Sequence, residues 1–170
     1  MAMGKLQEFK KMLTEGRLGF LMNEVMTGTH QFVDGAGPAG DLFMEFKVTW
    51  GNKHVSKFFN PLGKEFFRNT MSGKVTIEGL VQDAELEGKL ELLYFTEAKL
   101  KYSFNFRGPD GREYTYKGEK RDLRPWNLHR THMTLYGTVT ETDTGRLISN
   151  SILYFKLKTM PTFLASFRLA

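Results

Sequence analysis

An alternation of apolar and polar side chains over residues 42–50, interrupted only by Phe43, constrains this chain more than any other feature of its sequence. The apolar positions are Leu42, Met44, Phe46, Val48 and Trp50. This period of two predicts a strand with one face in the core and the other in solvent. The strand directly follows residues 35–40, whose letters match the G-x-G-x-x-G of a dinucleotide-binding loop.

The glycine segment therefore predicts a connection between strands and not a cofactor site. In a dinucleotide-binding loop the third glycine opens a helix, and the pyrophosphate lies on the N-terminus of that helix. Here residues such as Val48 and Trp50 follow, which start helices poorly. The residues directly before the loop also fit a buried parallel strand poorly. Such a strand is almost continuously apolar, and here only Phe32 and Val33 are apolar. We expect no flavin, nicotinamide or other cofactor at residues 35–40.

The composition is that of one globular domain. The chain has 170 residues, 41% of them hydrophobic and 14% aromatic, which is enough to bury a substantial core. No apolar run is long enough to cross a membrane and no secretory signal is visible, so we expect no transmembrane segment. The lack of cysteine excludes disulfides and suits a cytoplasmic location. The net charge of +5 comes from interleaved acids and bases, so we expect no nucleic-acid partner.

Three segments depart from the period of two. Apolar residues at helical spacing predict a helix within residues 1–22, the N-terminal helix and lead-in. This lysine-bearing helix suits either a lid on the domain or a helix on a membrane surface, and its short apolar face favours the lid. After the second strand, Asn52 and Asn60 predict the starts of two short helices. Residues 163–167 predict a short closing helix.

The best-determined element is a hairpin within residues 100–120. Its turn, residues 108–111, reads Gly-Pro-Asp-Gly and fits a three-residue loop with the last glycine in a left-handed bulge. The predicted cross-strand pairs are Phe106 with Tyr114, Phe104 with Tyr116, Arg107 with Glu113, and Lys101 with Glu119. A slip of one residue would place aromatic side chains opposite polar ones, and each matched pair favours this register by roughly 0.2–1 kcal/mol.

Further strands complete a mostly β fold. A second turn at residues 143–145 joins arms in residues 131–142 and 146–158, which are apolar on both faces, so we expect the interior on one face and a helix on the other. Residues 82–88 predict a polar turn. About eight strands, mostly in sequential hairpins, are best closed as an antiparallel barrel. We predict a single lipocalin- or calycin-like β-barrel domain over residues 1–170, with short helices at both ends and one helical insertion. Eight strands enclose room for one small ligand.

Short motifs along most of the chain resemble a known family. They are Asn23-Glu24-Val25-Met26-Thr27-Gly28, Thr70-Met71-Ser72-Gly73-Lys74-Val75, Glu87-Gly88-Lys89-Leu90-Glu91-Leu92, Leu100-Lys101-Tyr102, Tyr116-Lys117-Gly118-Glu119-Lys120 and Ala165-Ser166-Phe167-Arg168. They are similar to a small accessory domain appended to some cholesterol-oxidase-like flavoproteins of the glucose–methanol–choline type. The resemblance implies a domain that does not itself carry the flavin, with an oxidoreductase as a possible partner. No catalytic residue transfers from it, and we expect this domain to be free-standing.

The candidate ligand-binding residues of the first hairpin are aromatic. Tyr102, Phe104, Tyr114 and Tyr116 share one face of the predicted strands. Side chains of this kind form either a solid core or the wall of a ligand cavity, and the sequence does not separate the two. A filled interior is the default, because protein interiors normally pack without voids.

The segment after this hairpin mixes basic side chains with a tryptophan. Within residues 117–130, Arg124 and His129 flank Trp126 and could meet a polar or anionic headgroup at one mouth of the barrel. The alternative is a solvated loop with Trp126 over the barrel end. His129 and His132 are three residues apart, a spacing that directs them to opposite sides of a strand, so we expect no metal site.

Three classes of function are consistent with these observations. The first is a small accessory or carrier protein that binds an apolar, lipid- or sterol-like molecule in a barrel cavity. The second is a cofactor-free barrel enzyme, an isomerase or cyclase. The third is a docking module for a flavin oxidoreductase. We rank them in that order; the residues favour binding over catalysis without deciding whether any catalysis occurs.

Overall fold

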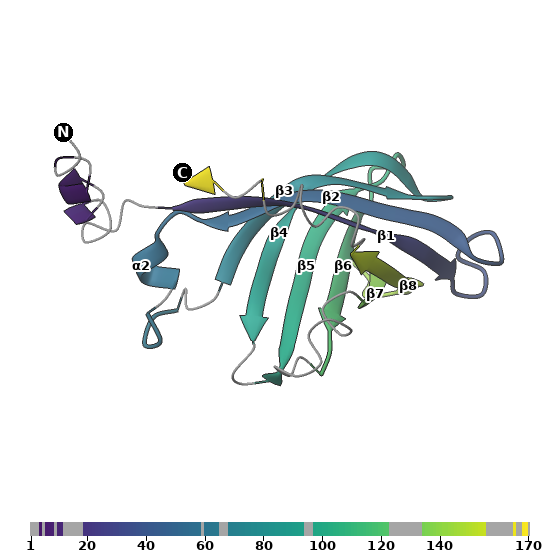
Figure 1. Ribbon diagram of the computed structural model, residues 1–170. Helices are drawn as coiled ribbons and strands as arrows, with labels where there is room; N and C mark the ends of the chain where they lie inside the picture. The colour runs from purple at the N-terminus through teal and green to yellow at the C-terminus, as the bar shows by residue number, and fades with distance from the viewer. Residues whose placement is uncertain are drawn as a thin grey trace.

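The chain forms a closed antiparallel β-barrel in the computed structural model (Figure 1). The strands are β1 (Phe20–Phe32), β2 (Leu42–Asn52), β3 (Arg68–Ile77), β4 (Val81–Leu93), β5 (Lys99–Arg107), β6 (Glu113–Lys120), β7 (Thr134–Glu141), β8 (Leu147–Phe155) and β9 (Arg168–Leu169), and the helix α2 spans Val55–Phe58. The structure describes residues 4, 6–8, 10–11, 19–58, 60–64, 68–93, 97–122, 134–155, 165 and 168–169.

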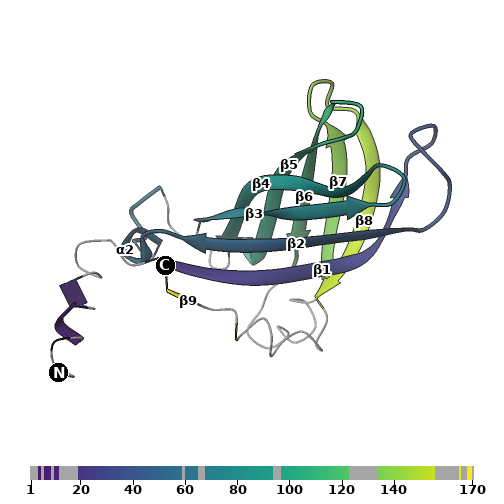
Figure 2. The same ribbon diagram turned by 90° about the horizontal axis from the view of Figure 1, so that it is seen from above.

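β1 closes the barrel. Each strand from β2 to β7 pairs with the next, and β1 pairs with both β8 and β2, so the eight-stranded ring has no free edge. The short strand β9 adds to the start of β1, where Leu169 lies opposite Phe20 (Figure 2). The predicted antiparallel barrel of eight strands is thereby confirmed. The predicted strand after Gly40 is confirmed as well, since the glycine segment joins β1 to β2.

The two ends of the barrel differ in their connections. At one end, which we call the hairpin end, tight turns join β3 to β4, β5 to β6 and β7 to β8, and residues 33–41 join β1 to β2. The helix α2 lies at the opposite end, which we call the long-loop end because residues 53–67 and 121–133 connect strands there (Figures 1 and 2). Longer connections are where scaffolds of this kind usually carry binding residues.

The hairpin of β5 and β6 has the predicted register. All four predicted cross-strand pairs form. The rings of Phe106 and Tyr114 stack with centroids 5.6 Å apart, and those of Phe104 and Tyr116 stack at 4.8 Å. Gly111 has φ +79°, which is the left-handed conformation that the bulged turn requires.

Aromatic side chains fill the middle of the barrel. Phe46 on β2 reaches across the interior to β5 and β6, with ring centroids 5.3 Å from Phe104, 5.9 Å from Tyr116 and 6.0 Å from Tyr102. These four rings are almost completely buried. Opposite walls of the barrel therefore meet at its centre, as in a packed protein interior.

Several sequence-based expectations are wrong. Residues 82–88 belong to β4 and not to a turn, because Leu86 points inward between outward acidic side chains and so continues the alternation. The turn lies at residues 78–80. Residues 60–64 form turns in place of the predicted second helix, since a hydrogen bond from the Gly63 amide to the Asn60 carbonyl closes the chain after Pro61.

The ends of the chain and the outer face of the barrel were predicted only in part. Helix is present at described positions among residues 4–11 and at Ala165. The strand β9 was not predicted. Tyr136 and Ile152 on the outer face of β7 and β8 are 42% and 41% exposed, so the expected helical cover over them is wrong. Within the described residues, no helix has the length and hydropathy needed to cross a membrane.

Candidate functional site

Four polar or amphipathic side chains meet inside the barrel at the long-loop end. They are Glu24 from β1, Trp50 from β2, Tyr102 from β5 and Lys120 from β6, and we call them the interior polar cluster. Each occupies a position whose neighbours two residues away also point inward, so the alternation of the strands directs all four to the interior.

The carboxylate of Glu24 is the centre of this cluster. It accepts a hydrogen bond from the Trp50 indole N–H at 3.0 Å and from the Tyr102 hydroxyl at 3.1 and 3.2 Å. Lys120 Nζ lies 3.2 Å from Glu24 Oε1 and donates to it. The side chains of Glu24 and Lys120 are only 4% and 5% exposed. The cluster is therefore a buried ion pair with two further neutral donors.

A buried ion pair is costly to form and is not needed to hold a barrel together. Removing two charges from water costs several kcal/mol per ion in real proteins, and apolar replacements are often neutral or stabilising. Here Trp50 and Tyr102 offset part of that cost by donating to the carboxylate. Burial and the nearby Glu24 charge raise the pKa of Tyr102 well above its usual value, so Tyr102 keeps its proton and remains a donor.

Apolar side chains surround the cluster on the side of the barrel mouth. Lys120 Nζ lies 5.3 Å from the centroid of the Tyr102 ring and 6.0 Å from that of Phe155. Phe20 contacts Trp50 edge to face at a centroid distance of 6.1 Å. Trp50 and Leu92 point inward but remain half-buried. The interior is consequently open to solvent at this end to a greater degree than at its centre.

The predicted site residues fall into two groups. Tyr102 belongs to the interior polar cluster. Phe104, Tyr114 and Tyr116 also point inward and are buried, but they stack on one another and on the rings beside them from the centre toward the hairpin end. Their proposed contact with a ligand stays a prediction.

The rest of the predicted site is not described. Arg124, Trp126 and His129 lie outside the described residues, and so does His132. Among the residues that are described, no group of three His, Asp or Glu side chains could hold a metal ion.

Sequence reasoning missed Glu24, Trp50 and Lys120 as parts of one site. The signal that could have found two of them is a charged residue at an inward position. Glu24 falls in register with inward Met26, and Lys120 falls in register with inward Tyr116. A charge on the core face of a strand is rare unless it is paired.

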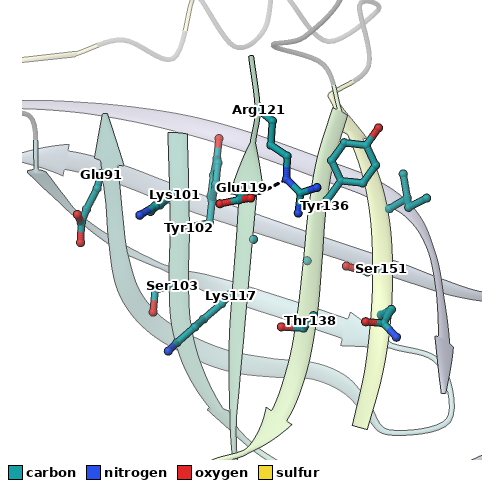
Figure 3. A pocket seen from close by; sticks show the side chains of 14 residues that line it. Glu91, Lys101, Tyr102, Ser103, Lys117, Glu119, Arg121, Tyr136, Thr138 and Ser151 are labelled. Carbon is teal, nitrogen blue, oxygen red and sulfur yellow. Dashed lines mark hydrogen bonds and ion pairs between the residues drawn. The ribbon is translucent and has the colours of Figure 1, made fainter. Parts of the chain in front are cut away.

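A hollow lies on the outer face of β5 to β8, with a volume of about 780 Å³. Figure 3 shows its two walls as two rows of side chains. One row contains Lys101, Glu119, Arg121 and Tyr136, and the other contains Ser103, Lys117 and Thr138. Arg121 donates to Glu119 at 2.6 Å and covers the Tyr136 ring at 5.2 Å, so the charges of the first row are already satisfied within the protein.

The floor of this outer hollow is backbone, because two glycines pair beneath it. Gly118 on β6 lies opposite Gly137 on β7. A Cβ atom on Gly137 would overlap the hydroxyl and ring of Tyr116, which lies flat against the inside of the wall. The Tyr116 hydroxyl accepts a hydrogen bond from Ser151 at 3.4 Å. The wall is therefore only one backbone thick between the packed aromatic interior and the outer hollow.

Comparisons with protein-family models, with curated proteins and with solved structures gave no match to this chain. The resemblance to an accessory domain of cholesterol-oxidase-like flavoproteins accordingly stays a prediction. Function is therefore inferred from the fold and from the contacts of the described side chains.

Proposed function

We propose that this protein binds a small, mostly apolar molecule at the long-loop end of the barrel, with one polar group of that molecule held by the interior polar cluster. The observation that carries the proposal is the Glu24 carboxylate, buried with Lys120 and bonded to Trp50 and Tyr102. A few convergent polar groups among apolar side chains are typical of ligand sites.

The filled centre of the barrel limits where such a ligand would lie. Because Phe46 contacts the rings of β5 and β6, the proposed ligand does not run through the barrel. It would enter past Trp50 and Leu92, which are half-buried, and stop at Glu24 and Lys120. The proposed role is that of a lipocalin-like carrier, with a lipid- or sterol-like ligand in one half of the interior. The lack of cysteine supports the cytoplasm as the proposed compartment.

Mass spectrometry of an organic extract of the purified protein tests this proposal. We expect a compound with an apolar body and one hydrogen-bonding group in the extract of the wild type. The double variant Glu24→Gln with Lys120→Met should yield none while remaining folded, since Gln still accepts from Trp50 and Tyr102 and no charge stays unpaired. The matched control is Glu97→Gln with Lys101→Met, which removes an exposed ion pair of 3.0 Å and should leave the compound bound.

A wild-type extract with no bound compound, together with no binding of added fatty acids or sterols, would refute the carrier role. Equal loss of the compound in the control variant would also refute it, because the loss would then not depend on the interior polar cluster.

A cofactor-free isomerase or cyclase is the second candidate function. Glu24, Tyr102 and Lys120 are groups that transfer protons in enzymes, and here they are buried and lie within hydrogen-bonding distance of one another. This role predicts a compound in a metabolite extract that changes its chromatographic retention but not its mass when wild-type protein is added. The same compound should be unchanged by the double variant. Docking to a flavin oxidoreductase rests on the sequence resemblance alone and ranks third.

A further inference from the structure

A separate pocket lies at the rim of the long-loop end, where the connection from β2 to α2 meets the start of β3 and the end of β4. Its volume is about 450 Å³, and we call it the rim pocket. The charged side chains of its described lining are all basic: Lys53, Lys64, Arg68 and Lys89. His54 lies beside them, and no described acidic residue contributes to the lining.

This grouping of like charges is unusual for the chain. Acidic and basic residues number 19 and 24 and are interleaved along the sequence, so most cations have an acid nearby. Arg68 has an ion-pair contact with Glu91, at 4.0 Å. Among the described residues Lys53, Lys64 and Lys89 have none. Cations in a concave surface repel one another and concentrate a positive potential there, which attracts anions.

Two of these cations project from the outer face of the barrel wall. Arg68 alternates with the inward Asn69 on β3, and Lys89 alternates with the inward Leu90 on β4. Both basic side chains therefore lie on the side of the sheet that faces solvent.

The lining is held in place by hydrogen bonds that do not use these groups. Asn52 donates to the Arg68 carbonyl at 2.8 Å and accepts from the His54 amide at 2.7 Å. Thr70 donates to the Gly51 carbonyl at 3.4 Å. The basic side chains are thus carried by a fixed backbone and are available to bind.

We infer that the rim pocket binds an oxyanion of the phosphate type. Lys53, Lys64 and Lys89 would supply point charges, and Arg68 would supply a planar pair of donors. The inference does not depend on the ligand proposed for the interior polar cluster.

Isothermal titration with sodium pyrophosphate tests the inference. We expect saturable binding to the wild type and at least a tenfold loss of affinity in the triple variant Lys53→Gln, Lys64→Gln and Lys89→Gln. The matched control changes three lysines of the outer face, Lys47, Lys74 and Lys117, to glutamine. It alters the net charge equally and should retain the wild-type affinity within about twofold, because none of these lysines lines the rim pocket.

Two further variants sharpen the result. Arg68→Gln should weaken pyrophosphate binding severalfold, since it removes the planar pair of donors. The double variant of Glu24 and Lys120 should bind pyrophosphate normally. Absence of saturable binding to the wild type, or an equal loss in the control triple variant, would overturn the inference; unchanged affinity in Arg68→Gln would overturn the role given to that guanidinium.

Vesicles identify the source of the phosphate. Binding to vesicles that contain phosphatidylglycerol, but not to phosphatidylcholine alone, with competition by pyrophosphate, would assign the site to a lipid headgroup. Pyrophosphate binding without vesicle binding would assign it to a soluble phosphate ester.

Discussion

The turn of β5 and β6 at the hairpin end and the interior polar cluster at the long-loop end are built from contacts of very different range. At the hairpin end, Asp110 accepts from the Arg112 amide at 3.0 Å and from the Tyr114 hydroxyl at 3.1 Å, both within four residues along the chain. At the long-loop end, the partners of Glu24 are 26, 78 and 96 residues away. Local turn chemistry shapes this turn, whereas the interior polar cluster exists only after strands from the whole chain have come together.

The largest loss of stability is expected for a substitution in the interior polar cluster at the long-loop end. Glu24→Gln leaves Lys120 as an uncompensated buried charge and should lower the free energy of unfolding by about 3–5 kcal/mol. The exposed pair of Glu97 and Lys101 is the reference, and Glu97→Gln should cost only about 0.3–0.5 kcal/mol. Urea denaturation measures both. Similar losses in the two variants would mean that Glu24 and Lys120 are solvated in solution.

A smaller loss of stability is expected for a substitution in the barrel wall between the interior and the outer hollow. Gly137→Ala should destabilise by about 1–3 kcal/mol, because the new methyl group overlaps the Tyr116 ring. In a double-mutant cycle with Tyr116→Leu the losses should be less than additive, since the shorter side chain frees the space. Strict additivity by denaturant titration would contradict the close packing of that ring against the glycine.

The turn of β5 and β6 is expected to show a more modest effect. Gly111 has φ +79°, so Gly111→Val should lower stability by about 1 kcal/mol or more. Gly111→Asn is the matched control and should retain most of the stability, because asparagine tolerates this conformation. Thermal unfolding distinguishes them, and an unchanged midpoint for the valine variant would argue against the bulged turn.

The smallest effect is a pH dependence at the hairpin end. His30 is buried, and burial lowers its pKa below the ordinary value of 6.5, although its contact with the Glu78 carbonyl opposes this. The unfolded chain then binds a proton more readily than the folded one, so stability should fall as the pH drops below about 6.5. His30→Gln should flatten this slope between about pH 7.5 and 5.5. A slope that is the same in both proteins would assign it to other groups.

The difference between local and long-range contacts explains which features of the structure could be predicted from the sequence. The register of Phe104 with Tyr116 is predictable because turn residues and side-chain pairs all lie within one short segment. Glu24 and Lys120 were not predictable as a pair, since nothing local links them and only the closure of the barrel brings them together. The prediction of a turn at residues 82–88 was wrong because most side chains there are polar and point outward, and Leu86 is the single large apolar side chain that points inward. Fold class followed from alternation, whereas the interior polar cluster depended on long-range pairing.

The closure through β1 also has a consequence for the order of events during synthesis. The hairpin of β1 and β2 can form as soon as residue 52 has emerged, but the other edge of β1 pairs with residues 149–155. For most of translation the growing sheet therefore has an open edge, which in other proteins invites pairing between chains. Such non-local closure is also slow. A chain released before β8 should be recognised by chaperones and aggregate, even though most of its hairpins are already complete.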